Sequence, residues 1–243
     1  MYVYRLLGIL IASLLTISTY TFAGISLDNT RIIFTSSNEQ RGQSIGVTSS
    51  SNSNEPYLVK AQILEDISGN NLETPFTVTP SIFRLEPGST NQLRILKTGN
   101  KILDQNKESI FYLRVIAIPA GKSNDSQRNT ELGGNIKIST GSIIKLIYRP
   151  DGLKPSLTES MGGLQITKIG NTLKIKNPSP YFITLASLSV GNKNIPISVI
   201  KQNTTILPFG EMTYNNVNFD SKKISWQTIN DYGGLEKFNK EIK

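Results

Sequence analysis

The chain of 243 residues contains no cysteine and no histidine. Without a thiolate or an imidazole, it cannot build the usual zinc sites, a cysteine nucleophile, a Ser–His–Asp triad or a histidine general base. We also find no pair of acidic residues spaced for acid–base catalysis, and no glycine-rich phosphate-binding loop. The sequence therefore predicts no metal site, no cofactor and no catalytic residues, and it favours a protein that is not an enzyme.

Acidic residues are also relatively few: the chain has 18 Asp and Glu against 26 Lys and Arg, which gives a formal net charge of +8. A basic chain can attract nucleic acid or an anionic surface. Here, however, the basic residues are spread along the chain without a dense cluster, and no helix-turn-helix or RNA-binding signature accompanies them. We therefore expect no nucleic-acid partner.

The N-terminal segment Met1–Ala23 has the pattern of a secretory signal peptide. Arg5 supplies the positive start, Leu6–Leu15 supplies a short apolar run, and Thr21-Phe22-Ala23 places small residues at the cleavage positions. A membrane anchor is the rival interpretation, since the uncharged stretch is long enough to span a bilayer. Serine and threonine fill its second half and favour cleavage after Ala23. Export without cysteine requires a fold that holds without disulfides.

After Gly24 the sequence is a succession of alternating or β-branched runs separated by turn signals, such as Glu86-Pro87-Gly88. We see no long helix and no fixed-period repeat. Short strands at this spacing predict an all-β fold built from sandwiches. The first set of candidate strands comprises Ile25–Leu27, Arg31–Phe34, Gln43–Thr48, Pro56–Glu65, Phe76–Thr79, Ile82–Leu85, Asn91–Leu96, Ser109–Ile118 and Ile136–Tyr148.

A charged segment with glycine and proline, Asp151–Pro155, resembles a linker. We therefore predict a signal peptide at 1–23, an N-terminal domain at 24–150 and a C-terminal domain at 151–243, both of ordinary domain size. The second set of candidate strands comprises Leu164–Ile169, Thr172–Lys176, Thr184–Val190, Ile195–Ile200, Gly210–Phe219 and Ile224–Ile229.

The stretch Gly141–Pro150 combines a strand pattern with a lysine in the middle of an apolar run. Lysine is rarely buried without a partner. Lys145 therefore either points to water from an edge or a cleft, or has an anionic partner. Arg149 follows on the same face of the strand, because alternate residues share a face.

A polar segment at 120–135 is long for a hairpin loop, and such segments are often functional. It leads into Ile136-Lys137-Ile138, the alternating start of the same strand. An exposed alternating edge is normally blunted by charge, because it is a template for pairing with another chain. If this edge is open, it can accept a strand from a partner, or from a second copy of the chain.

Seven blocks in the right order resemble the periplasmic pilus-assembly chaperones of Gram-negative chaperone–usher pathways. The resemblance covers nearly all of the chain after the signal peptide. The blocks are Thr30-Arg31-Ile32-Ile33-Phe34, Glu55-Pro56-Tyr57-Leu58-Val59, Arg84-Leu85-Glu86-Pro87-Gly88, Lys107–Tyr112 through Ile118-Pro119, Ile144–Pro150, Asn177-Pro178-Ser179-Pro180-Tyr181 and Ile229–Gly234.

The resemblance implies two immunoglobulin-like sandwiches arranged in an L, with a cleft that holds the C-terminal carboxylate of a pilus subunit. By motif, the cations that bind this carboxylate are Arg31 and Lys145, and such charge-assisted bonds are strong. The family also lends a strand to its subunit, a recognised case of β-strand addition. The implied donor residues are Ile136, Ile138, Thr140, Ser142 and Ile144, while ordinary core side chains of the strand are the competing interpretation.

The resemblance further implies an interdomain salt-bridge network of Glu108, Arg149 and Asp231, which would set the angle between the domains. Two residues depart from the family pattern. Arg114 stands where a small polar residue is common, and Asp104 where a small or apolar one is usual. The loop before the donor strand is longer than in the short-loop branch of the family but lacks the cysteine pair of the long-loop branch, so the sequence does not assign the chain to either branch. It also does not decide whether the last strand of the C-terminal domain is complete.

The implied function is a periplasmic chaperone that binds and stabilises pilus subunits by donor-strand complementation and delivers them to an outer-membrane usher. A self-capping homodimer is a further possible partner. The alternative is an exported β-sandwich structural or adhesive surface protein, and a third hypothesis is an exported hydrolase using Asp28, Asp66 or Glu108.

Overall fold

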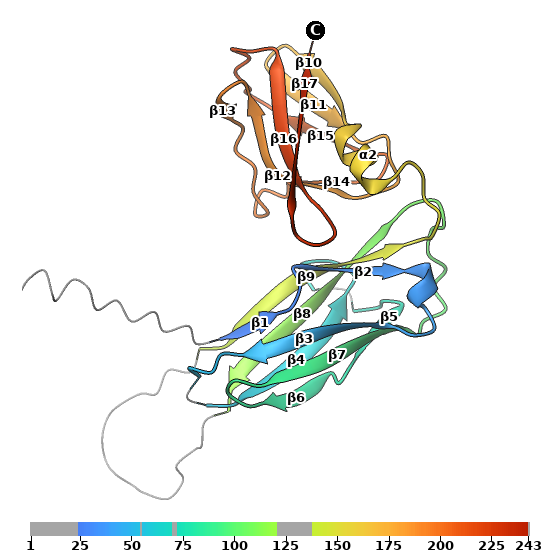
Figure 1. Ribbon diagram of the computed structural model, residues 1–243, viewed down its shortest axis with the longest axis vertical. Helices are drawn as coiled ribbons and strands as arrows, with labels where there is room; N and C mark the ends of the chain where they lie inside the picture. Colours follow the sequence, from blue (N-terminus) through green and yellow to red (C-terminus); the bar gives the residue numbers. More distant parts are fainter. Residues whose placement is uncertain (1–23, 54, 70–71, 121–137, 243) are drawn as a thin grey trace, which may run out of the picture.

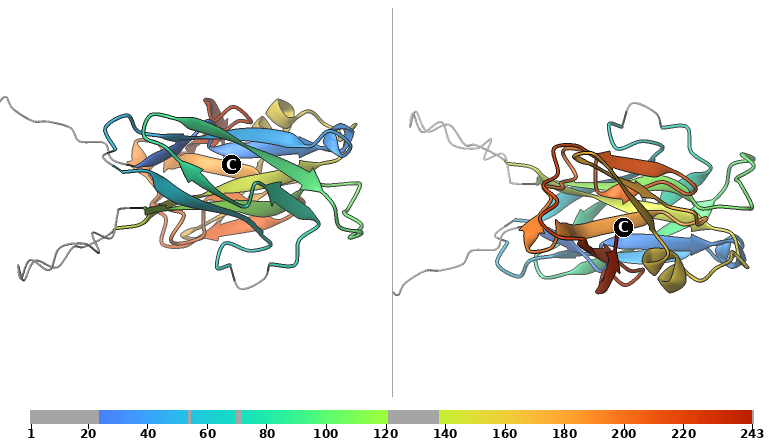
Figure 2. Two further views of the ribbon diagram at one scale, coloured as in Figure 1. Left: turned by 90° about the horizontal axis from the view of Figure 1, so that it is seen from below. Right: turned by 90° about the horizontal axis from the view of Figure 1, so that it is seen from above.

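The computed structural model describes residues 24–53, 55–69, 72–120 and 138–242. Almost all of their regular structure is strand, which confirms the prediction of an all-β fold. Two β-sandwiches follow one another along the long axis (Figure 1). Strand β2 (Arg31–Thr35) of the N-terminal sandwich runs across this axis, whereas β16 (Lys223–Ile229) of the C-terminal sandwich runs along it, so the sandwiches meet at an angle, as in the predicted L (Figure 1). Seen along the long axis, the two sandwiches overlap (Figure 2). The predicted signal peptide lies outside the described residues.

The N-terminal sandwich consists of two sheets that enclose one core. The first sheet has the order β1 (Ile25–Leu27), β3 (Gln43–Ser49), β7 (Thr90–Lys97), β5 (Phe76–Thr79). The second has the order β2 (Arg31–Thr35), β9 (Thr140–Arg149), β8 (Ser109–Pro119), β4 (Tyr57–Leu64), β6 (Ile82–Leu85), and a short 3-10 turn η1 (Ser36–Asn38) follows β2.

An aromatic cluster fills the N-terminal core at the end nearest the other sandwich. Phe76 contacts Phe34 edge-on, with ring centroids 5.0 Å apart, and Phe111 at 5.1 Å. Tyr148, on β9, stacks on Phe34. Such edge-on pairs stabilise a core beyond the area they bury. These contacts hold the C-terminal end of β9 against the core and so position the residues on the outward face of the strand.

The C-terminal sandwich begins after a six-residue helix, α2 (Leu157–Gly162), which starts with a capping box between Ser156 and Glu159. One sheet has the order β10 (Gln165–Ile169), β11 (Thr172–Lys176), β15 (Glu211–Tyr214). The other has the order β13 (Lys193–Asn194), β12 (Ile183–Val190), β16 (Lys223–Ile229), β17 (Leu235–Glu241), with β14 (Thr205–Ile206) also paired to β12.

The predicted strand at Ile195–Ile200 is wrong, because these residues form a loop after β13. Pro196 has no N–H for a sheet ladder, and Asn203 closes the loop by accepting a hydrogen bond from the Ser198 amide at 2.8 Å. Ile200 is left 95% exposed. The predicted strand at Gly210–Phe219 shortens to β15, since the chain turns at Asn216, whose φ is 57°.

The sequence did not decide whether the C-terminal domain has a last strand. The structure shows that β17 is this strand, at the edge of the sheet and paired along the whole of β16. Its alternation of lysine and glutamate with Phe238 is that of a strand with one solvated face. The charges suit an edge position, because they discourage pairing with other chains. The turn between β16 and β17 points toward the N-terminal sandwich (Figure 1).

Candidate functional site

Strand β9 is paired along its whole length on one side but only along half of it on the other. β8 pairs with it from Thr140 to Tyr148. β2 runs parallel to it and pairs only from Lys145 to Arg149. Within the described residues, the edge from Thr140 to Ile144 therefore has no partner strand on the β2 side. Its outward amides and carbonyls are available to another chain.

The two faces of β9 have different surroundings. Ile144, Leu146 and Tyr148 pack into the N-terminal core, and the strand alternation places Thr140 and Ser142 on the same face. The register with β8 is regular, so Lys145 lies on the opposite face. Ile138 precedes the strand and is 72% exposed. The predicted donor residue Ile136 lies outside the described residues.

Lys145 lies opposite Arg31 in the parallel ladder, so both side chains stand on the outer face of the sheet. The Lys145 ammonium donates hydrogen bonds to Thr184 Oγ1 at 2.9 Å and Thr205 Oγ1 at 2.7 Å, both in the C-terminal sandwich. Burial, and then the charge of Arg31, lower the pKa of Lys145 to about 8. Within the described part of the chain, no carboxylate forms an ion pair with it.

Arg31 is only 9% exposed and is incompletely bonded. One terminal nitrogen donates to the Ile229 carbonyl at 3.2 Å, while Nε has no partner among the described residues. Burial lowers the pKa of Arg31, and the charges of Asp231 and Glu108 offset part of that effect. A buried guanidinium with an unused donor is costly unless a ligand completes it.

A cavity of about 510 Å³ lies between the two sandwiches, with Lys145 in its wall. Thr184 and Thr205, the two hydroxyl partners of Lys145, also line it. Most of the remaining wall is apolar, from Ile67, Ile110, Phe182, Val199 and Leu207. Tyr112 and Asp66 add polar groups on the side of the N-terminal sandwich. The volume lies within the usual range of ligand pockets.

Beside this cavity, Arg149 joins Glu108 to Asp231. Its Nε donates to Glu108 at 2.6 Å, and its two terminal nitrogens donate to the two oxygens of Asp231 at 2.7 and 2.8 Å. Glu108 also accepts a bond from the Phe182 amide at 2.7 Å, and the Arg149 guanidinium lies 5.2 Å from the centre of the Tyr181 ring. The three side chains connect both sandwiches.

The network pairs one guanidinium with two carboxylates, so negative charge exceeds positive charge within it. Burial by itself would lower the pKa of Arg149, but its bonds to Asp231 and Glu108 outweigh burial and raise that pKa. Burial raises the pKa of the Glu108 carboxyl, and Arg149 and the Phe182 amide counteract that rise. The desolvation cost and the attraction are therefore of similar size.

The sequence did not reveal the two threonines that contact Lys145. Thr184 and Thr205 come from β12 and β14, which are paired to each other. Neither residue carries a motif, so only the packing of the two sandwiches identifies them. The unusual Arg114 donates to Gln62 on the neighbouring strand at 2.8 Å. Asp104 accepts a bond from the Asn106 amide in the loop before β8.

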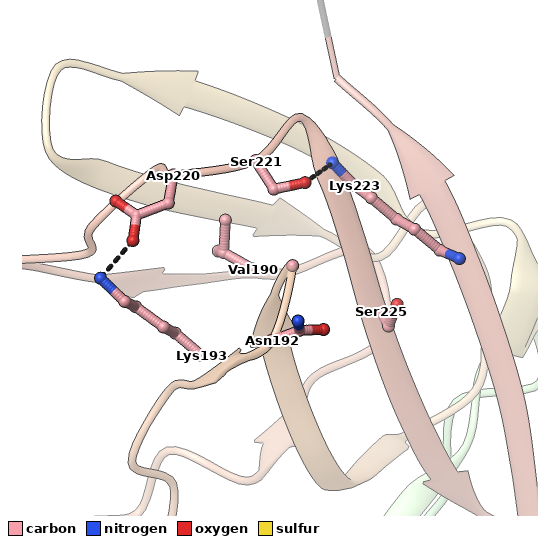
Figure 3. Close-up of a pocket in the computed structure, with 8 residues that line it drawn as sticks. Val190, Asn192, Lys193, Asp220, Ser221, Lys223 and Ser225 are labelled. Atoms are coloured by element: carbon pink, nitrogen blue, oxygen red, sulfur yellow. Dashed lines mark hydrogen bonds and ion pairs between the residues drawn. The ribbon is translucent and has the colours of Figure 1, made fainter.

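A second hollow lies at the far end of the C-terminal sandwich, where β16 begins (Figure 3). Lys193 is ion-paired with Asp220 there, and Ser221 accepts a bond from the Lys223 amide at 3.1 Å. The ion pair of Lys193 and Asp220 is thus a structural contact within the C-terminal sandwich. Among the described residues no cluster of acidic side chains could hold a metal ion. None of their helices is long and apolar enough to cross a membrane.

Comparison with known proteins agrees with this geometry. Residues 24–154 match the family described as "Pili and flagellar-assembly chaperone, PapD N-terminal domain", and residues 159–240 match "Pili assembly chaperone PapD, C-terminal domain". The chain belongs to the pili assembly chaperone family. This confirms the resemblance that the sequence blocks carried.

Two relatives of the pili assembly chaperone family illustrate the extent of the match. The probable fimbrial chaperone protein ElfD of Escherichia coli K12 is 33% identical over 211 residues, which cover 86% of this chain and 83% of that protein. The chaperone protein FimC of the same strain is 32% identical over 230 residues, covering 95% of this chain and 89% of the relative.

Solved structures of chaperones share the fold. The SafB chaperone, determined in complex with the Salmonella enterica SafA pilin, has a TM-score of 0.74 at 28% identity, covering 92% of this chain and 99% of that chain. The Escherichia coli chaperone DraB also has a TM-score of 0.74, at 29% identity, covering 90% and 99%. The alternative of a structural or adhesive surface protein is therefore not favoured.

Proposed function

We propose that this chain is a periplasmic chaperone that holds pilus subunits by lending them the free half of β9 and then passes them to an outer-membrane usher. Chaperone function in pilus assembly follows from its family. The subunit-binding residues, the usher and the periplasmic location are the finer parts of the proposal. No catalytic role is assigned to any residue.

The observation that carries the proposal is the half-paired edge of β9. A partner strand that pairs with Thr140–Ile144 lies in line with β2, which occupies the rest of the same edge. The partner strand therefore cannot continue past Lys145 and must have a chain end there. The end falls at Arg31 and Lys145, the first residues of the β2–β9 ladder.

Charge decides which chain end fits. A C-terminal carboxylate would receive bonds from Lys145 and from the unused donor of Arg31. An N-terminal ammonium would instead be repelled by both cations. The site thus favours a strand whose C-terminus meets β2, which is a strand parallel to β9. This reasoning supports Arg31 and Lys145 as the carboxylate anchor.

The inward face of β9 supports the role of donor strand. Ile144 already packs against the N-terminal core, and Ser142 and Thr140 continue that face beside the open edge. A partner that pairs with this edge would extend the core with its own apolar side chains. We include Ile136 and Ile138 as donors, although only Ile138 lies within the described residues.

The network of Glu108, Arg149 and Asp231 supports a fixed angle between the sandwiches. It places Thr184 and Thr205 against Lys145, which lies on the N-terminal sandwich. An anchor made of groups from two domains requires such a fixed geometry. The network is proposed as a positioning element and not as a contact to the subunit.

The test is co-expression with the pilus subunits encoded beside the gene, followed by pull-down. We expect Lys145→Ala and Arg31→Ala to lose the subunit by at least tenfold while staying folded. Lys174→Ala is the matched control, because Lys174 forms an exposed ion pair on the C-terminal sandwich. If both anchor variants retain the subunit as the wild type does, the anchor is wrong.

Two further parts of the proposal need separate measurements. Cleavage after Ala23 is checked by mass spectrometry of the protein recovered from the periplasm. Capping of the free β9 edge by a second copy is checked by sedimentation at several concentrations, and a constant monomer mass would exclude it. Binding to the usher is measured with the subunit-loaded protein.

A further inference from the structure

The Lys145 amine is unusual in its immediate surroundings. It lies in the wall of a cavity of about 510 Å³, and its two hydrogen-bond acceptors are the hydroxyls of Thr184 and Thr205. A neutral amine has two N–H donors and one lone pair. With both donors directed at the two hydroxyls, the lone pair occupies the remaining tetrahedral position, where a third N–H of the charged ammonium would find no acceptor among the described residues.

The walls of the cavity define which molecules can approach this amine. Phe182, Ile110, Leu207 and Val199 provide apolar contact surface around it. Glu65 and Asp66 line the same cavity and disfavour an anionic compound inside it, while Lys145 disfavours a cationic one. The space inside the cavity is therefore suited to a flat, neutral ring of modest size.

We propose that Lys145 forms a reversible imine with neutral aromatic aldehydes that fit the cleft cavity. The amine lone pair attacks the carbonyl carbon and forms the C–N bond, while the carbonyl π electrons move to oxygen, which takes a proton. The resulting carbinolamine loses water as the nitrogen gives up its proton, and the C=N bond forms. The reaction needs no other reactant.

The protonation state of Lys145 supports this site. Its pKa of about 8 implies that, at pH 7.5, its neutral fraction is roughly a hundredfold larger than that of an ordinary lysine. The charged and titratable groups around it are Arg31 on β2, Tyr112 on β8, and Glu65 and Asp66 after β4. From β12 and β14 it meets only the two threonine hydroxyls.

Other lysines provide the internal reference. Lys101 and Lys193 are exposed and ion-paired with Glu65 and Asp220. An α-amino group has an unperturbed pKa near 8 and is a positive reference for a reactive amine. If the cavity contributes, Lys145 must therefore be modified faster than the exposed lysines and faster than the α-amino group.

The experiment treats the full folded protein with benzaldehyde and sodium cyanoborohydride, which traps each imine, and maps the modified amines by mass spectrometry. We expect Lys145 to be modified at least tenfold faster than Lys101 or Lys193 at pH 7.5. The rate at Lys145 should level off above about pH 8. Equal rates at the three lysines would overturn the inference.

The role of the cavity is tested by replacing benzaldehyde with propanal. The preference for Lys145 over the α-amino group should be at least threefold larger with the aromatic aldehyde. An unchanged preference would show that the cavity selects nothing. Lys145→Arg keeps the cation and must abolish the adduct, while Lys97→Arg must leave it unchanged.

This inference can fail independently of the proposed function. If a bound pilus subunit covers Lys145, modification of the loaded protein should fall at least tenfold. Loss of selectivity in the free protein contradicts the imine site and leaves the carboxylate anchor intact. Selective modification that a subunit does not reduce contradicts the anchor and leaves the imine site intact.

Discussion

Two groups of cations at the junction of the sandwiches differ in their partners. Arg149 bonds to two carboxylates, Glu108 and Asp231, and its nitrogens are fully used. Arg31 and Lys145 lie nearby on the same sheet, yet their bonds go to a carbonyl and to two hydroxyls. Neutral acceptors hold these two side chains in place without cancelling their charge.

The difference distinguishes structural charge from binding charge. A cation whose charge is balanced within the protein orients its surroundings and offers little to a ligand. A partly buried cation with neutral partners carries an uncompensated cost that an anionic ligand can relieve. The four predictions below test this comparison, from the largest expected effect to the smallest.

Arg149→Ala should lower the free energy of unfolding by about 3–5 kcal/mol, because it leaves the buried Glu108 carboxylate without its ionic partner. Glu108 is 2% exposed, so water cannot replace the guanidinium. Urea denaturation followed by tryptophan fluorescence measures the change. Lys174→Ala, which breaks an exposed ion pair, should cost less than about 1 kcal/mol. Equal effects in the two variants would refute the structural role of Arg149.

Lys145→Met should have the opposite effect and raise the free energy of unfolding at pH 7 by about 1–3 kcal/mol. The folded-state pKa of about 8 lies below the unfolded value, so the charged lysine destabilises the fold at every pH below 8. This cost disappears as the pH rises toward 10.5.

The two proteins should therefore differ in stability at pH 7 and converge near pH 10, as measured by urea denaturation at both values. The same variant should lose subunit binding. A variant that is less stable than the wild type at pH 7 would show that Lys145 is a structural cation like Arg149.

Subunit binding should weaken as the pH rises through the pKa of Lys145. The free protein loses the anchor charge above about pH 8, so the affinity should fall by up to tenfold for each further pH unit. Titration of a fluorescent peptide with a free C-terminal carboxylate, at pH 7 to 9.5, measures this. An amidated peptide is the control and should bind weakly at every pH. A flat profile for the free carboxylate would contradict the anchor.

Ser142→Ile should tighten subunit binding by severalfold to about tenfold, because the new side chain continues the inward face of Ile144 beside the open edge. Ile143→Thr changes the opposite face and should leave the affinity unchanged. Competition between the variants for one subunit in the periplasm compares them directly. A stronger effect at 143 than at 142 would reverse the assignment of the donor face.

Local patterns in the sequence determined most of the strands. Phe76–Thr79 and Ile82–Leu85 begin and end where the alternation predicted, and Lys145 attracted attention because a cation interrupts an apolar run, whereas Arg31 was identified only by its motif. The errors have local reasons as well. Ile195–Ile200 has the composition of a strand, but Pro196 and the turn at Gln202 exclude it from a ladder. In β17, charges obscured a genuine edge strand.

The sequence by itself determined the fold class and the missing chemistry of cysteine and histidine, and it singled out Lys145 as a cation within an apolar strand. Only the tertiary structure decided that β2 pairs with half of β9 and leaves the other half open. It also decided that Thr184 and Thr205, from another domain, accept hydrogen bonds from the Lys145 ammonium. Alternation and composition act between neighbours in the chain, whereas partners at a distance of 39 and 60 residues meet only when two cores pack against each other.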